Sequence, residues 1–204
     1  TVGRHLLDLI KLGSMPRDRL MSLVEFEGAD TVEQAYARGR GVIFYSGHFG
    51  FWELQAMAHA YRFEPMAVVF RTLDNPRLDA LLERVRTRCG TRAIYRRGAI
   101  RRVLRELAAK RGVAMLIDQH IHDSSAVYVD FFNRPAATTS AIALLALRTG
   151  APVIPTFSLL LPGGRYRMVY EPAVEPPRTE GPEAVREFTE RCTNVLERYV
   201  RRYP

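Results

Sequence analysis

The stretch Gly41-Val-Ile-Phe-Tyr-Ser-Gly-His48-Phe-Gly-Phe-Trp-Glu53-Leu54 predicts a strand that turns into a helix. Val42–Tyr45 are apolar, β-branched and aromatic, as in a buried strand. Gly47 and Gly50 mark the turn, and residues 54–61 carry a helical pattern. The histidine therefore falls at the strand end, where open α/β sheets bind ligands.

His48 and Glu53 are five residues apart across this turn. A carboxylate one turn into the helix can hold the imidazole in one tautomer, which makes His48 a candidate general base for a hydroxyl nucleophile. The spacing also arises by chance, and a core histidine with a surface glutamate is the alternative. The position of His48 between two glycines, beside the only tryptophan, favours the catalytic interpretation.

Strands and helices alternate along the rest of the chain, which predicts one α/β domain over residues 1–204 with a mainly parallel central sheet flanked by helices. The N-terminal segment, about 1–22, is expected to be helical. Further strands are expected at 23–26, 66–70, 93–95, 113–117, 153–161 and 166–170, the last two as a hairpin. Helices are expected at 30–38, capped by Asp30, and at 76–88, 99–110, 138–149 and 182–201.

The composition, 47% hydrophobic and 25% charged over 204 residues, is that of a globular domain. No apolar run approaches the roughly 20 residues that a membrane helix needs. Cys89 and Cys192 fit no metal or redox motif, so free thiols are expected. The net charge of +8 indicates an acidic partner such as nucleic acid, an anionic membrane or an acidic protein.

Four blocks in order resemble the lysophospholipid acyltransferase superfamily, in particular its branch of bacterial lipid A biosynthesis acyltransferases, over about residues 24–204. They are Gly47-His-Phe-Gly-Phe-Trp-Glu-Leu54, Phe70-Arg-Thr-Leu-Asp-Asn-Pro76 with Leu78-Asp79, Asp118-Gln119 with Phe131-Phe-Asn-Arg-Pro-Ala136 and Thr138, and Arg148-Thr-Gly-Ala-Pro-Val-Ile-Pro155. Phe51 and Asn133 depart from the family pattern, and so does the segment His120-Ile-His122-Asp123. The family also has an upstream anchor and a downstream segment, so both ends are expected to be truncated.

The resemblance implies a glycerol-phosphate-acyltransferase-like fold and acyl transfer from a thioester to a hydroxyl, with His48 as base and Glu53 orienting it. It implies that Arg71 binds a phosphate, with Asn75, Asp118 and Gln119 as further substrate-binding candidates. Asp118 also ends a predicted strand, which places it near the His48 edge. Asn75 equally suits a turn, and a surface or capping role is the alternative for Arg71 and Asp118.

No cofactor is expected besides the acyl thioester as co-substrate, and no acyl-enzyme is needed because the thioester is already activated. The implied partners are an acyl carrier protein or acyl-CoA as donor, an anionic glycolipid such as a lipid A precursor as acceptor, and a membrane surface, with no nucleic acid. The implied location is the cytoplasmic face of the bacterial inner membrane. The helix start after Gly50 offers amides for an oxyanion.

Two other functions stay open. Asp118, His120, His122 and Asp123 lie within six residues and suit a metal-dependent hydrolase. The basic cluster suits a nucleic-acid-binding module, a lipid or carrier-protein surface, or simply a solvated helix face; it comprises Arg92, Arg96, Arg97, Arg101, Arg102 and Arg105. An acyl-chain groove or plain core packing are the alternatives for Phe131, Phe132, Leu144, Leu145 and Leu147.

Overall fold

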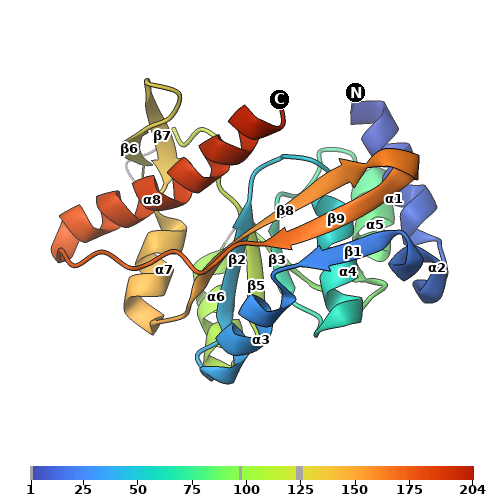
Figure 1. Ribbon diagram of the computed structural model, residues 1–204, viewed down its shortest axis with the longest axis horizontal. Coiled ribbons are helices and arrows are strands. Elements are labelled where there is room, and N and C mark those ends of the chain that lie inside the picture. Colours follow the sequence, from blue (N-terminus) through green and yellow to red (C-terminus); the bar gives the residue numbers. More distant parts are fainter. Residues whose placement is uncertain (1, 97, 123–125) are drawn as a thin grey trace.

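A seven-stranded sheet runs through the centre of the molecule (Figure 1). The computed structural model describes residues 2–96, 98–122 and 126–204. From edge to edge the order is β1 (Val24–Glu27), β9 (Arg165–Tyr170), β8 (Val153–Leu161), β2 (Val42–Ser46), β5 (Gly112–Leu116), β3 (Ala67–Phe70) and β4 (Arg92–Tyr95). Every neighbouring pair is parallel except β8 and β9, which a 3-10 turn (Pro162–Gly164) joins as a hairpin. The predicted α/β fold with a mainly parallel sheet is confirmed.

Helices cover both faces of the sheet (Figure 1). One layer contains α1 (Val2–Gly13), α2 (Arg17–Ser22), α3 (Ala29–Ala37), α4 (Trp52–Arg62) and α5 (Pro76–Thr87). The opposite layer contains α6 (Ala99–Ala108), α7 (Ala141–Thr149) and α8 (Gly181–Arg202). α8 crosses the molecule as its longest helix and packs against α7 and β8.

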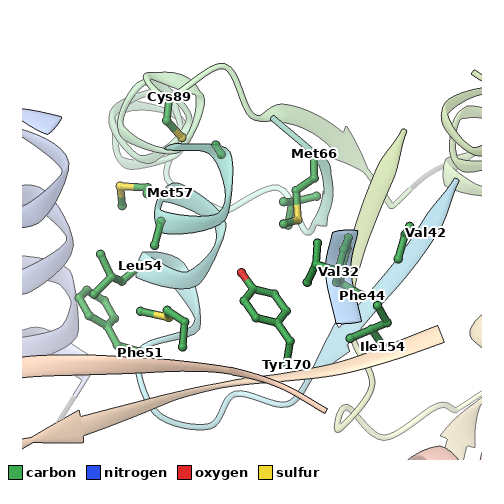
Figure 2. Packing of buried hydrophobic residues seen from close by; sticks show 14 of the residues in the cluster. Val32, Val42, Phe44, Phe51, Leu54, Met57, Met66, Cys89, Ile154 and Tyr170 are labelled. Carbon is green, nitrogen blue, oxygen red and sulfur yellow. The ribbon is translucent and has the colours of Figure 1, made fainter. Parts of the chain in front are cut away.

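The run Val42–Tyr45 in the central strand β2 is apolar because every residue of this strand is buried. Val42 and Phe44 belong to the hydrophobic cluster on the side of α1–α5, which Figure 2 shows from close by. Ile43 and Tyr45 belong to the cluster on the side of α6, α7 and α8. A parallel strand that is buried on both faces has no polar side to alternate with. The strand predicted from this run is therefore confirmed, and it fixes the position of the turn that follows it.

The structure differs from the sequence predictions after β5. Residues 135–139 form β7 (Pro135–Thr139), which pairs antiparallel with β6 (Ala126–Asp130) in a separate two-stranded sheet, and the helix predicted at 138 begins only at Ala141. The short Ala- and Thr-rich run carries little strand signal, and contacts of β6 with α8 stabilise the hairpin. Asp30 was also wrong as a cap, because Gly28 occupies that position with a φ of 75°.

Both cysteines are buried and free, as expected. Within the described residues, no helix is both long and apolar enough to cross a bilayer.

Candidate active site

The pairing register of β2 and β5 brings His48 and Asp118 together. Ser46 at the end of β2 lies opposite Leu116 at the end of β5. The amide of Ile117 still donates to the carbonyl of Ser46, at 3.0 Å, so the two chains leave the sheet side by side. The residues two positions beyond each strand end, His48 and Asp118, therefore meet at the carboxyl edge of the sheet.

Asp118 holds His48 through two hydrogen bonds. Its Oδ1 lies 2.8 Å from Nδ1 of the imidazole, and its Oδ2 accepts from the backbone N–H of His48 at 2.6 Å. Because an ionised carboxylate only accepts, Nδ1 carries the proton and Nε2 is left as the basic nitrogen. The side chain of His48 is 44% exposed and that of Asp118 25%, so the imidazole is reachable while its partner is shielded.

This pair shifts the pKa of both groups in the directions that stabilise an imidazolium. The hydrogen bond from Asp118 raises the pKa of His48 above its ordinary value, against an opposing effect of burial. Burial raises the pKa of Asp118, but its hydrogen bonds with His48 outweigh this effect and lower the pKa overall. Asp118 is therefore charged at neutral pH, where it favours the tautomer of His48 with a free Nε2.

Two glycines make the turn around His48 possible. A Cβ on Gly47 would lie 3.0 Å from Oδ2 of Asp118, so a side chain there would crowd the carboxylate. Gly50 has a φ of 61°, and a Cβ there would lie 1.9 Å from the carbonyl oxygen of Ser158 in β8. The turn thus packs directly on the neighbouring strand and begins α4 at Trp52.

Glu53 binds Arg86 of α5, and this differs from the predicted contact with His48. Nε of Arg86 lies 3.2 Å and 3.0 Å from the two carboxylate oxygens, and Nη2 also bonds Oε1. The side chains are only 10% and 12% exposed. The carboxylate that contacts the imidazole is therefore Asp118 and not Glu53. The ends of the neighbouring strands β2 and β5 lie side by side, whereas the side chain of Glu53 lies against Arg86. The charge of Glu53 also raises the pKa of His48, after the larger effects of Asp118.

The guanidinium of Arg86 packs against the rings of Phe70 and Trp52, and Trp52 lies beside His48. The guanidinium carbon of Arg86 lies 4.3 Å from the ring centre of Phe70 and 5.8 Å from that of Trp52. Trp52 in turn meets the His48 ring edge-to-face, with ring centres 5.5 Å apart. The Glu53–Arg86 pair thus supports the wall against which the imidazole rests.

His48 lines a cavity of about 530 Å³ at the carboxyl edge of the sheet. The walls are mainly apolar, and three arginines also line it: Arg71, Arg86 and Arg96. Arg71 is 70% exposed, and among the described residues its ion-pair partner is Asp74, at 3.8 Å. Gln119 lines the same cavity. A cavity of this size and character suits an amphipathic ligand with an anionic group.

The remaining candidates are not among the residues that line the His48 cavity. Asn75 caps α5, with its side-chain oxygen accepting from the amides of Arg77 and Leu78 at 3.0 and 3.2 Å. The rings of His120 and His122 are 4.5 Å apart, whereas Asp123 lies outside the described residues, as does Arg97. Among residues 2–96, 98–122 and 126–204, no group of three or more His, Cys, Asp or Glu side chains is placed to hold a metal ion.

Arg86 was not among the residues singled out from the sequence, although a signal for it exists. It follows Leu78 and Leu82 at intervals of four, so it continues the inward stripe of α5. Glu53 likewise occupies a buried position of α4. Opposite charges on the inward faces of two helices predict a buried pair, because an unpaired buried charge is costly.

Comparison with known proteins gives a consistent result. The family model described as bacterial lipid A biosynthesis acyltransferase matches residues 1–204. The chain is 28% identical over 167 residues to a lipid A biosynthesis myristoyltransferase of Escherichia coli, covering 82% of this chain and 51% of that protein. It is 27% identical over 176 residues to a lipid A biosynthesis acyltransferase of Haemophilus influenzae, covering 85% and 55%. A lipid A biosynthesis lauroyltransferase of Escherichia coli is 27% identical over 174 residues, covering 84% and 56%. The chain thus spans about half the length of these relatives.

Proposed function

The chain belongs to the family of bacterial lipid A biosynthesis acyltransferases. We therefore propose that it transfers a fatty acyl chain from a thioester to a hydroxyl of a lipid A precursor or related glycolipid. The observation that carries the proposal is the His48–Asp118 pair, which opens on a largely apolar cavity with cationic groups in its walls. The acyl donor is an acyl carrier protein or coenzyme A thioester, and no cofactor takes part.

His48 acts as general base in this proposal. Nε2 takes the proton of the acceptor hydroxyl as its oxygen attacks the thioester carbonyl. The tetrahedral intermediate then collapses, the carbon–sulfur bond breaks, and the imidazolium returns the proton to the leaving sulfur. The products are the acyl ester and a free thiol. Asp118 stabilises the imidazolium between these two steps, and its distance of 2.8 Å from Nδ1 supports this role.

The oxyanion is stabilised by amides at the start of α4. The first N–H groups of a helix lack partners within that helix, and its dipole favours negative charge at this end. Trp52, the first residue of α4, lines the cavity, which supports the assignment.

Arg71 binds a phosphate of the acceptor, and Gln119 contributes a polar contact in the same cavity. The weak contact of Arg71 with Asp74 and its large exposure support a role toward ligand, because the guanidinium fork is left open for a phosphate. Asn75 serves this site indirectly, by starting α5 and thereby placing Arg86 under Trp52. We place the protein at the cytoplasmic face of the inner membrane, where a lipid acceptor is available.

The test uses purified full-length protein with acyl-carrier and coenzyme A thioesters and a panel of glycolipid acceptors, read by mass spectrometry. We expect an acylated glycolipid from wild type, and about 10²–10⁴-fold less from His48→Ala, the usual contribution of a general base. His122→Ala, an exposed histidine outside the cavity lining, is the matched control and retains transfer. A folded and fully active His48→Ala variant, judged by its thermal midpoint, contradicts the proposal.

A further inference from the structure

Helix α6 presents an exposed row of positive charge, formed by Arg101, Arg102 and Arg105, which we call the α6 arginine face. The described parts of the chain offer these three guanidinium groups no ion pair, hydrogen bond or aromatic partner. Arg101 and Arg105 are one helical turn apart, so their like charges repel and weaken the helix slightly. The row is therefore not explained by the stability of α6 itself.

The carboxylates near α6 do not neutralise this face. Glu106, on the same helix, is turned toward Arg92 and Arg111, with nitrogen–oxygen distances of 3.0 and 2.6 Å. On helix α8, by contrast, three arginines pair with glutamates three or four positions away: Arg186 with Glu183 and Glu190, Arg191 with Glu187, and Arg201 with Glu197. The charge on α6 is thus left available to an external acidic group.

The α6 arginine face begins at the rim of the His48 cavity. α6 follows β4 and starts at the carboxyl edge of the sheet, and Arg96, Ala99 and Ile100 all line the cavity. A molecule bound along α6 therefore lies next to the opening through which a substrate reaches His48.

We propose that the α6 arginine face docks an acidic protein that carries the acyl group as a thioester and delivers it into the His48 cavity. This inference rests on the proposed acyltransferase function. A protein fits better than a bilayer because α6 exposes a single large apolar side chain, Ile100, which lines the His48 cavity, whereas its other exposed positions carry arginine and alanine. Helices that bind a membrane interface combine basic residues with large apolar ones that insert. Uncompensated charge instead steers a soluble partner of opposite charge.

The test compares two donors of the same acyl chain: acidic acyl carrier protein, and the small neutral thioester of N-acetylcysteamine. The variant reverses Arg101, Arg102 and Arg105 to Glu. We expect kcat/KM with the carrier protein to fall about 100-fold at low salt, within the range of electrostatic steering, and a much weaker salt dependence. With the small thioester, kcat/KM stays within about twofold of wild type.

The matched control makes the same charge change elsewhere, by reversing the exposed residues Arg38, Arg84 and Arg178 to Glu. It retains wild-type kcat/KM with both donors. Equal losses with both donors in the α6 variant, no loss with either, or loss only of binding to anionic vesicles each overturn the docking proposal. Absence of transfer by wild type from both donors would instead refute the acyltransferase function, so the two failures are distinguishable.

Discussion

Nδ1 of His48 lies 2.8 Å from Oδ1 of Asp118, although the two residues are seventy positions apart in the chain. The contact follows from the sheet, because Ser46 at the end of β2 lies opposite Leu116 at the end of β5, and His48 and Asp118 each lie two residues past these ends. It also depends on Gly47, since a side chain there would crowd the carboxylate. The candidate base is therefore oriented by two neighbouring strand ends.

Asp118→Asn removes the negative charge while conserving the shape of the side chain. An amide there either fails to accept from Nδ1–H or presents its own N–H to the ring, so the tautomer with a free Nε2 is lost. We expect kcat/KM to fall by about 10²–10⁴, in line with loss of an orienting carboxylate elsewhere. Steady-state kinetics measures this, and near-native activity at an unchanged thermal midpoint would contradict the role of Asp118.

The Glu53–Arg86 pair predicts a pattern of stabilities. Glu53→Gln leaves a buried guanidinium without its charged partner, and we expect the free energy of unfolding to fall by about 3–5 kcal/mol. The double variant Glu53→Leu with Arg86→Met replaces both charges by apolar groups and recovers most of that loss. Urea denaturation of the single and double variants gives the comparison.

The same variants distinguish a supporting role of Glu53 from direct contact with the base. If the pair acts by supporting Trp52, the activity of each variant follows its folded fraction. A Glu53→Gln variant with native stability but no activity would contradict this supporting role. It would favour the direct action of Glu53 on His48 that the sequence suggested.

Gly50→Ala tests the packing of the turn on β8. The new Cβ would lie 1.9 Å from the carbonyl oxygen of Ser158, and the φ of 61° disfavours any L side chain. Since the clash is with backbone, we expect a large drop in thermal midpoint together with loss of transfer. Gly98→Ala is the control, because its φ of 71° is similar but, beyond its own chain neighbours, no atom of the described residues lies within 4 Å of the added Cβ. Equal midpoints for the two variants would contradict this packing.

His59 predicts the acid stability of the fold. It is fully buried between the hydroxyls of Tyr36 and Tyr170, at 3.2 and 3.0 Å, and burial lowers its pKa to about 3. Below about pH 6.5 this histidine binds a proton in the unfolded chain but stays neutral in the folded protein. It therefore lowers the free energy of unfolding as pH falls toward 3.

The slope of this effect is measurable. Between those limits His59 contributes a loss of about 1.4 kcal/mol per pH unit. We expect the unfolding free energy of His59→Gln to fall correspondingly less steeply, since the amide can bond both tyrosines without titrating. Parallel pH profiles of wild type and variant would show that His59 is protonated in the folded state.

The main elements of this fold are predictable from the sequence because their signals are local. The wholly apolar run at Val42–Tyr45 marks a central strand, and Asn75-Pro76 marks a helix start that the capping hydrogen bonds confirm. The β6–β7 hairpin was missed because its strands are short, lie outside the main sheet and depend on contacts with α8. Contacts between segments this far apart in the chain cannot be predicted from the local sequence.

The candidate site shows the same division. Asp118 was placed near the His48 edge because parallel strands end together, but its contact with the imidazole depends on β2 and β5 being neighbours in register. Strand adjacency comes from the tertiary fold, so sequence spacing favoured Glu53 instead. Arg86 carried a helical-stripe signal, but its partner on another helix was needed to interpret it.

The role of His48 as a base whose pKa is raised by Asp118 is best examined through the pH dependence of kcat/KM in wild type and Asp118→Asn. A general base must be unprotonated, so activity rises through the pKa of His48, which the hydrogen bond from Asp118 raises above the ordinary 6.5. Removing the carboxylate lowers this pKa, so we expect the residual activity of Asp118→Asn to rise at a distinctly lower pH than that of wild type. Coincident pH profiles for the two proteins would contradict it.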